Sequence, residues 1–93
     1  MRITYDPAKN ERNIQKRGLS FDRVAEFDFG SAVIEIDQRR DYGETRVVAL
    51  GYLGSRLHAL CFVETDAGVR VISFRKANSR EMKRYASTKT AHE

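Results

Sequence analysis

The stretch VRVISFRKANSREMKRY, residues Val69–Tyr85, decides the fold, because it predicts the last strand of a sheet that runs directly into a helix. Its apolar side chains alternate up to Arg75, which is typical of a strand. Asn78 then precedes Glu81 by three residues, an asparagine version of the capping box that begins a helix. Six cations in this stretch are opposed only by Glu81, and they predict an anionic partner. They are Arg70, Arg75, Lys76, Arg80, Lys83 and Arg84.

Strict alternation divides the side chains of this strand between two faces. One face would carry Val69, Val71, Ser73 and Arg75, and the other Arg70, Ile72 and Phe74. We therefore expect Arg75 to lie beside the cations of the helix and Arg70 to point to the opposite face. On the helix, Met82, Tyr85 and Ala86 fall on a stripe that would pack on the sheet. The outward cations Arg80, Lys83 and Arg84 would either bind phosphate or form a solvated helix face.

Three further strands are predicted upstream, at Ala32–Asp37, Arg46–Leu53 and Leu57–Thr65. In the first, the alternation of Ala32, Ile34 and Ile36 with the residues between them indicates a half-buried strand. The connections Gly54-Ser55-Arg56 and Asp66-Ala67-Gly68 are too short for helical crossovers. The sheet is therefore expected to be largely antiparallel.

The N-terminal third predicts two helices and a possible short strand at Ile3–Tyr5. Asp6 suits the N-cap of the first helix, and Gly18 suits the left-handed position that ends it. Ser20 would begin a second, short helix. The fold class is α+β: two N-terminal helices, a mostly antiparallel sheet of four long strands plus the possible short one, and a C-terminal helix.

Length and composition indicate one globular domain over residues 1–93, with residues 88–93 as a frayed tail that lacks core side chains. The net charge of +4 and the pI near 9.5 suit either a nucleic-acid ligand or a solubilising surface. The single cysteine, Cys61, excludes an intramolecular disulfide and a four-cysteine zinc site. No segment resembles a signal peptide or a membrane helix, so we expect a cytoplasmic protein without a membrane partner.

Few side chains are candidates for acid–base chemistry. Glu44 and Arg46 lie two apart at the start of a strand, as either an ion pair or a general base held ionised by its neighbour. His58 alternates with the apolar side chains of its strand, so it is either a structural histidine or a catalytic one. His92 lies in the tail. We expect no metal site and no cofactor.

Three motifs, in order along the chain, resemble those of the BrnT family of toxins, and the likeness covers residues 3–86. The first comprises Tyr5-Asp6-Pro7-Ala8-Lys9, Asn13 and Lys16-Arg17-Gly18-Leu19-Ser20-Phe21. The second comprises Glu44-Thr45-Arg46 and Leu50-Gly51, and the third Arg70–Ala77 with Glu81 and Tyr85. Two departures stand out: Tyr5 replaces a tryptophan, and Arg17 replaces a histidine.

The resemblance implies a RelE-like ribonuclease fold and the toxin half of a bacterial type II toxin–antitoxin pair, which blocks translation by cutting RNA. It also implies a BrnA-like antitoxin with a ribbon-helix-helix domain. In such a pair the toxin meets operator DNA only indirectly, through the antitoxin. If the family's histidine shuttles a proton, Arg17 cannot replace it, because arginine stays protonated near neutral pH.

These implications, with the residue types, assign a site for metal-independent RNA cleavage. Glu44 would be the general base. Phosphate and transition-state charge would be held by Lys9, Arg17, Arg46 and Arg75, and flanking RNA by Lys76, Arg80, Lys83 and Arg84. Two alternatives stay open: a non-catalytic module that binds RNA or antitoxin in an autorepressing complex, and an unrelated basic adaptor domain.

Overall fold

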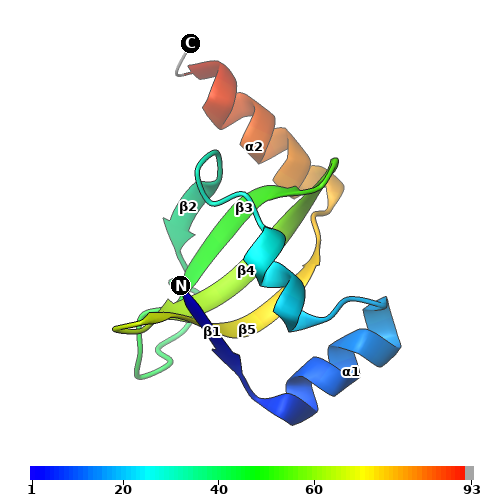
Figure 1. Ribbon diagram of the computed structural model, residues 1–93. Helices are drawn as coiled ribbons and strands as arrows, with labels where there is room; N and C mark the ends of the chain where they lie inside the picture. Colours follow the sequence, from blue (N-terminus) through cyan, green and yellow to red (C-terminus); the bar gives the residue numbers. More distant parts are fainter. Residues whose placement is uncertain (92–93) are drawn as a thin grey trace.

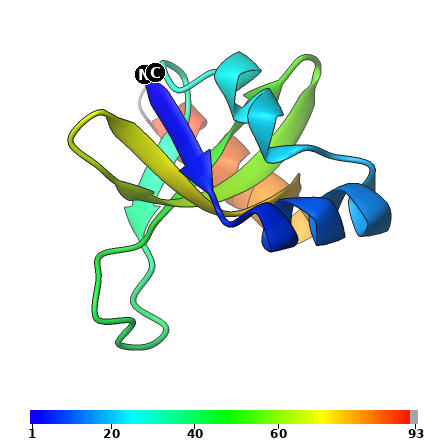
Figure 2. The same ribbon diagram turned by 60° about the horizontal axis from the view of Figure 1, so that its bottom comes forward.

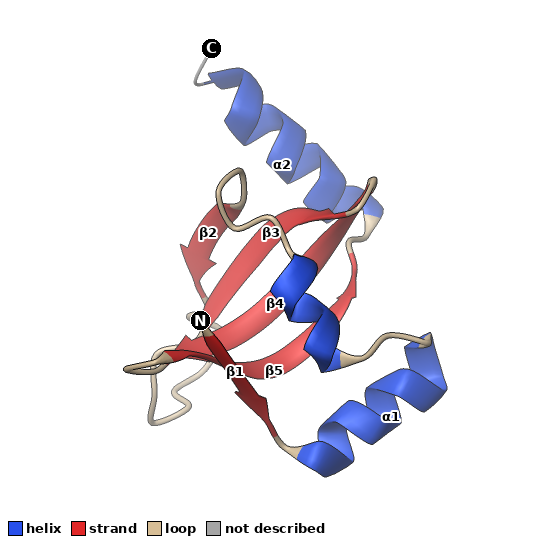
Figure 3. Cartoon of the chain, viewed as in Figure 1, coloured by secondary structure: helices blue, strands red, loops and turns tan. Residues whose placement is uncertain are grey.

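The computed structural model describes residues 1–91 and shows an α+β fold around a five-stranded mixed sheet (Figures 1 and 3). The elements are β1 (Arg2–Tyr5), α1 (Pro7–Arg17), the 3₁₀ helix η1 (Phe21–Glu26), β2 (Val33–Ile36), β3 (Val47–Leu53), β4 (Arg56–Glu64), β5 (Gly68–Lys76) and α2 (Ser79–Ala91). The strand order is β1-β5-β4-β3-β2. Only β1 is parallel to its neighbour, β5, so the prediction of a mostly antiparallel sheet is confirmed.

Several details differ from the expectation. The second helix is a 3₁₀ helix, and β2 has only four residues, so three strands are long rather than four. Helix α2 continues past Ser87 to Ala91, so the expected fraying is wrong as far as Ala91. Residues 92–93, which include His92, lie outside the described residues.

Both ends of α1 form as the sequence predicts. The Asp6 carboxylate accepts a hydrogen bond from the Ala8 N–H, and Pro7 takes the first helical position. Gly18 has a left-handed backbone with φ of 66°, and its N–H donates to the Ile14 carbonyl at 2.7 Å. The local signals therefore fix this helix, although none of its residues is buried.

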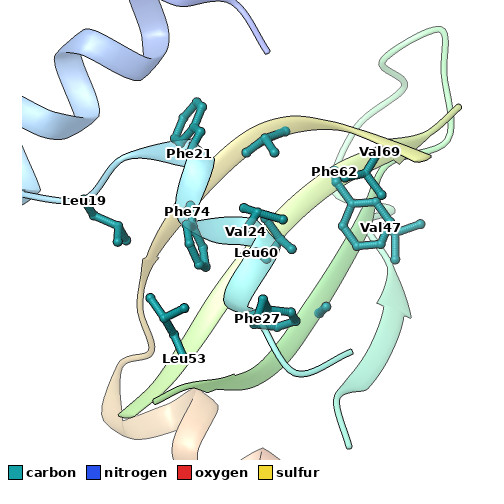
Figure 4. Close-up of a cluster of buried hydrophobic side chains, with 12 residues drawn as sticks. Leu19, Phe21, Val24, Phe27, Val47, Leu53, Leu60, Phe62, Val69 and Phe74 are labelled. Carbon is teal, nitrogen blue, oxygen red and sulfur yellow. The ribbon is translucent and has the colours of Figure 1, made fainter. Parts of the chain in front are cut away.

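One face of the sheet carries the hydrophobic core, which η1 covers (Figure 4). Phe21 and Val24 of η1 pack toward Leu60 of β4 and Phe74 of β5, and all four side chains are fully buried. The edge strand β2 lies beyond this cover. The expected half-buried strand is therefore wrong for its isoleucines, since Ile34 is 54% and Ile36 56% exposed.

A β-bulge in β5 changes which of its side chains share a face. Cys61 pairs with Ser73 but Phe62 pairs with Val71, so Ile72 is an extra residue in the ladder. The side chains before and after Ile72 consequently exchange faces. The core face carries Val69, Val71, Phe74 and Lys76, and the opposite face carries Arg70, Ser73 and Arg75. The expectation that Arg70 and Arg75 point to opposite faces is wrong.

Helix α2 leaves the end of β5 and lies behind the sheet, on the face opposite η1 (Figures 1 and 2). Glu81 is its only buried residue. Met82 is 40% exposed, so its predicted packing on the sheet is wrong. Tyr85 does anchor the helix, because its hydroxyl donates to the Ser31 carbonyl and its ring contacts Tyr52 edge to face.

Candidate functional site

Helix α1 presents a row of cations beside β5. Lys9, Arg12, Lys16 and Arg17 line a shallow pocket of about 240 Å³ whose floor includes Ser73. Their spacing of three or four residues places most of them on one side of the helix. No acidic residue lines this pocket.

Two asparagines hold this polar helix against the sheet. The Asn13 side-chain amide donates to the carbonyls of Leu19 and Phe74, at 2.9 Å each. The Asn10 side-chain oxygen accepts from the Phe21 N–H at 2.7 Å. Partly buried polar contacts of this kind replace the apolar stripe that α1 lacks. They position the row of cations relative to β5, a role that charge and spacing alone do not indicate for either asparagine.

A second pocket, of about 510 Å³, continues from Arg17 across the end of the sheet. Its lining includes the cations Arg17, Arg23, Arg56 and Lys76, together with His58, and no acidic residue. Arg23 is paired with Glu26 at 3.0 Å, outside the pocket. The other three cations form no ion pair with the described part of the chain.

We call the unpaired cations of the two pockets the α1 surface. Its members are Lys9, Arg12, Lys16, Arg17, Arg56 and Lys76. Within residues 1–91, none of them lies in an ion pair. Positive charge without internal counter-ions attracts an external anion, and arginine forks match phosphate oxygens.

The opposite side of the sheet has a cleft of about 490 Å³ between β2, β5 and α2, which we call the α2 cleft. Its cations are Arg39, Arg75, Arg80 and Arg84. Three of these are paired with acids of the same cleft: Arg39 with Asp37, Arg75 with Glu81, and Arg84 with Glu35. Of the four, only Arg80 has no such pair among the described residues.

Arg75 is held in a network that begins α2. Its guanidinium donates to both Glu81 oxygens, at 2.7 and 3.0 Å. Glu81 also accepts from the Asn78 N–H, and the Asn78 side chain accepts from the Glu81 N–H, so the predicted capping box is present. The hydrogen bond from Arg75 is the main cause that lowers the pKa of the buried Glu81 carboxyl. This network explains how Arg75 joins the strand to the helix.

Glu44 and Arg46 lie in the segment between β2 and β3, which projects from the side of the molecule away from α1 (Figure 2). Arg70 donates to both Glu44 oxygens, at 2.8 and 2.7 Å, and Arg46 donates to one of them at 3.4 Å. The hydrogen bond from Arg70 is the first cause that lowers the pKa of Glu44. Arg46 also lies over the Tyr42 ring, 4.0 Å from its centroid. Glu44 is therefore an ionised ion-pair partner in this arrangement.

A family model described as a ribonuclease toxin, BrnT, of a type II toxin–antitoxin system matches residues 5–81. The chain belongs to the BrnT family. Membership in a type II toxin–antitoxin family implies an antitoxin as partner. The comparison with curated proteins found no match.

The BrnT match spans the whole α1 surface and ends at Glu81. Of the residues predicted from the sequence, the structure brings Lys9 and Arg17 together on α1, with Lys76 beside Arg17 in the second pocket. Arg75, Arg80 and Arg84 meet on the other side of the sheet. Glu44 and Arg46 form a third group, and Lys83 lines none of these pockets. The predicted site is therefore three separate groups.

Residues 1–91 contain no group of three or more histidine, cysteine, aspartate or glutamate side chains arranged to hold a metal ion. None of the described helices is long and apolar enough to cross a membrane.

Proposed function

We propose that this BrnT chain, as one RelE-like domain over residues 1–93, binds single-stranded RNA on the α1 surface and cleaves it without a metal or cofactor, which stops translation. The observation that carries the proposal is the set of six cations without internal counter-ions at the junction of α1, β4 and β5. An RNA backbone supplies negative charges that such a surface can neutralise.

Cleavage without a metal requires little from the protein, because RNA carries its own nucleophile in the 2′-hydroxyl. The protein has to orient the phosphodiester, stabilise charge that develops on its oxygens, and transfer protons. We propose that Lys9 and Arg17 perform the first two tasks, with Lys76 holding the flanking backbone. All three line these two pockets, which share Arg17.

The sequence also proposes Arg75, Arg46 and Glu44 as catalytic groups. The Arg75 guanidinium already donates two hydrogen bonds to the Glu81 carboxylate, so an RNA phosphate would have to displace that carboxylate to bind Arg75. The lowered pKa of Glu44 makes it a weak proton acceptor near neutral pH. The geometry therefore supports structural ion pairs at these residues more than contact with RNA. For Arg80, Lys83 and Arg84 we propose a secondary part in holding RNA.

We propose further that the partner is a BrnA-like antitoxin with a ribbon-helix-helix domain, through which the pair reaches operator DNA. An acidic antitoxin segment on the α1 surface would neutralise the cations that RNA needs. Toxin and antitoxin would then meet in the cytoplasm, where translation takes place. The support is the charge of the α1 surface together with the family.

The test is RNA cleavage by the purified chain in EDTA, with growth arrest on expression without antitoxin. We expect Arg17→Ala to lower the cleavage rate at least about tenfold. The matched control is Lys89→Ala, a cation on α2 outside these pockets, which should cleave at the wild-type rate. A folded wild type that cuts no RNA and leaves growth normal would contradict the proposal.

One observation favours a second function, that of a non-catalytic module that binds RNA or antitoxin. Arg17 stands where the family resemblance places a histidine, and its guanidinium cannot accept a proton near neutral pH. Normal growth with soluble wild type and arrested growth with Arg17→His would establish this alternative. Growth arrest by the wild type would exclude it.

A further inference from the structure

The second pocket contains a histidine that the proposed chemistry has not used. His58 begins the core-facing row of β4 and is only 5% exposed, yet its ring lines the pocket with Arg17, Arg56 and Lys76. In the sheet it pairs directly with Lys76. The ring also lies 5.5 Å from the Phe74 ring, which limits its freedom to turn. The fold thus holds an imidazole at the base of a cationic pocket.

The hydrogen bonds of His58 determine which ring nitrogen is free. Nδ1 lies 2.8 Å from the Arg56 carbonyl oxygen, which can only accept, so Nδ1 carries the hydrogen and donates it. In the neutral ring Nε2 is then the unprotonated nitrogen. Nε2 forms no hydrogen bond with residues 1–91, and among them only Arg84 Nε is a buried side-chain nitrogen or oxygen without a partner. Nε2 is therefore reached by solvent.

The charges that face His58 are all positive. They come from α1 (Arg17), η1 (Arg23), β4 (Arg56) and β5 (Lys76), and no acidic residue lines the pocket. Burial is the main cause that lowers the pKa of His58 below its ordinary value, and the charges of Arg56, Lys76 and Arg23 lower it further. The hydrogen bond to the Arg56 carbonyl acts in the opposite sense. The imidazole is therefore neutral at physiological pH and able to accept a proton.

We propose that His58 Nε2 is the general base that accepts the proton of the RNA 2′-hydroxyl, while Arg17 holds the phosphate to be cleaved and Arg56 and Lys76 hold the backbone beside it. The inference rests on the proposed RNA cleavage and adds its missing proton acceptor. It also explains how the chain could cleave RNA although Arg17 cannot accept a proton. Arg17, which replaces the histidine of the family motif, holds the phosphate, and His58 on β4 accepts the proton.

The step balances as an internal transesterification. The 2′-oxygen attacks the adjacent phosphorus and forms a new P–O bond, and its proton passes to His58 Nε2. The bond from phosphorus to the 5′-oxygen breaks, and the leaving oxygen takes a proton from water. The products are a 2′,3′-cyclic phosphate and a 5′-hydroxyl end. The imidazolium, destabilised by the surrounding cations, then releases its proton to solvent.

The principal test compares His58→Asn with the wild type on a short RNA. The asparagine amide can keep the donor to the Arg56 carbonyl but has no basic nitrogen at the position of Nε2. We expect kcat to fall about 100-fold or more, while affinity for a 2′-O-methyl RNA of the same sequence stays within about twofold. Lys89→Ala again serves as the control. An unchanged kcat in His58→Asn would overturn the inference.

Two further measurements separate a base from a structural histidine. In His58→Ala, added imidazole should restore part of the lost rate, and a structural defect would not respond to it. In the wild type, kcat/KM should rise with pH through one ionisation below the ordinary histidine value of 6.5 and then stay level. A flat profile from about pH 5 to about pH 8 would contradict the assignment without use of any variant. A wild type that never cleaves RNA contradicts the proposed function itself, whereas cleavage independent of His58 contradicts only this inference.

Discussion

The α1 surface and the α2 cleft are both rich in arginine and lysine, but only the α2 cleft contains acids to match. Arg39, Arg75 and Arg84 each meet a carboxylate at 2.7–2.8 Å. The six cations of the α1 surface meet none among residues 1–91. Val69–Tyr85 contains six cations, yet three of them, Arg70, Arg75 and Arg84, are held in ion pairs within the fold. Available charge, rather than total charge, locates the proposed RNA site.

The largest expected effect concerns the α2 cleft. Glu81→Ala removes the partner of Arg75 and half of the capping box of α2. We expect the free energy of unfolding to fall by about 2–3 kcal/mol, because a half-buried guanidinium loses its counter-ion. Denaturant unfolding measures it. The control is Glu26→Ala, whose exposed pair with Arg23 should contribute much less, because water screens it. If both variants lost the same free energy of unfolding, the pair of Arg75 and Glu81 would not stabilise the α2 cleft more than an exposed ion pair does.

The next effect compares the two regions as RNA ligands. Replacing Lys9, Lys16 and Arg17 together by alanine should weaken binding of a 2′-O-methyl RNA about 30- to 100-fold and reduce the salt slope by about two. The matched triple variant at Arg80, Lys83 and Arg84 should change affinity less than about threefold, because Glu35 already neutralises Arg84. Fluorescence anisotropy at several salt concentrations gives both quantities. A larger loss of affinity in the Arg80, Lys83 and Arg84 variant would place the RNA-binding site on α2 instead.

Acid should weaken the α2 cleft, because its ion pairs depend on ionised carboxylates. Glu81 and Asp37 of the α2 cleft have lowered pKa values, chiefly through hydrogen bonds from Arg75 and Arg39. Their contribution to stability is complete above the unfolded-state pKa of each carboxyl and is lost as pH falls through the lower folded-state value. The free energy of unfolding should therefore decrease on acidification, and less so in Glu81→Gln. A Glu81→Gln variant with the same acid dependence as the wild type would contradict this.

The smallest effect belongs to the exposed pair of Arg84 and Glu35, which joins α2 to the edge strand. Arg84→Ala should lower the free energy of unfolding by no more than about 1 kcal/mol, since the side chains of Arg84 and Glu35 are 40% and 45% exposed. Thermal unfolding measures the change. A loss as large as that of Glu81→Ala would show that this pair, rather than the capping box, holds the helix.

Local signals in the sequence predicted the helix caps, the three long strands to within one residue and the helix after β5. They could not predict the bulge at Ile72, because strict alternation leaves no place for an extra residue. Nor could they predict counter-ions far along the chain: Glu44 pairs with Arg70, and Glu35 with Arg84. The bulge alone moved Lys76 to the side of His58 and Arg70 to the side of Arg75.

The candidate site was predicted only in part, because its residues come from elements that are far apart in the sequence. Lys9, Arg17 and Lys76 were identified from charge and motif, and they line the two pockets that share Arg17. His58 was left between a structural and a catalytic role, because alternation placed it on the apolar face without indicating the pocket at its end. No local signal indicates that pocket, because it forms only where Arg17 of α1 comes close to the ends of β4 and β5.

The most direct test of the account is a map of where RNA binds, by amide chemical-shift changes on titration with a short 2′-O-methyl RNA that cannot be cleaved. The account predicts that the largest changes fall on α1 from Lys9 to Arg17, and at Arg56, His58 and Lys76. Changes confined to β2 and α2, around Glu35 and Arg80, would contradict it, since RNA would then be bound in the cleft whose charges are already paired.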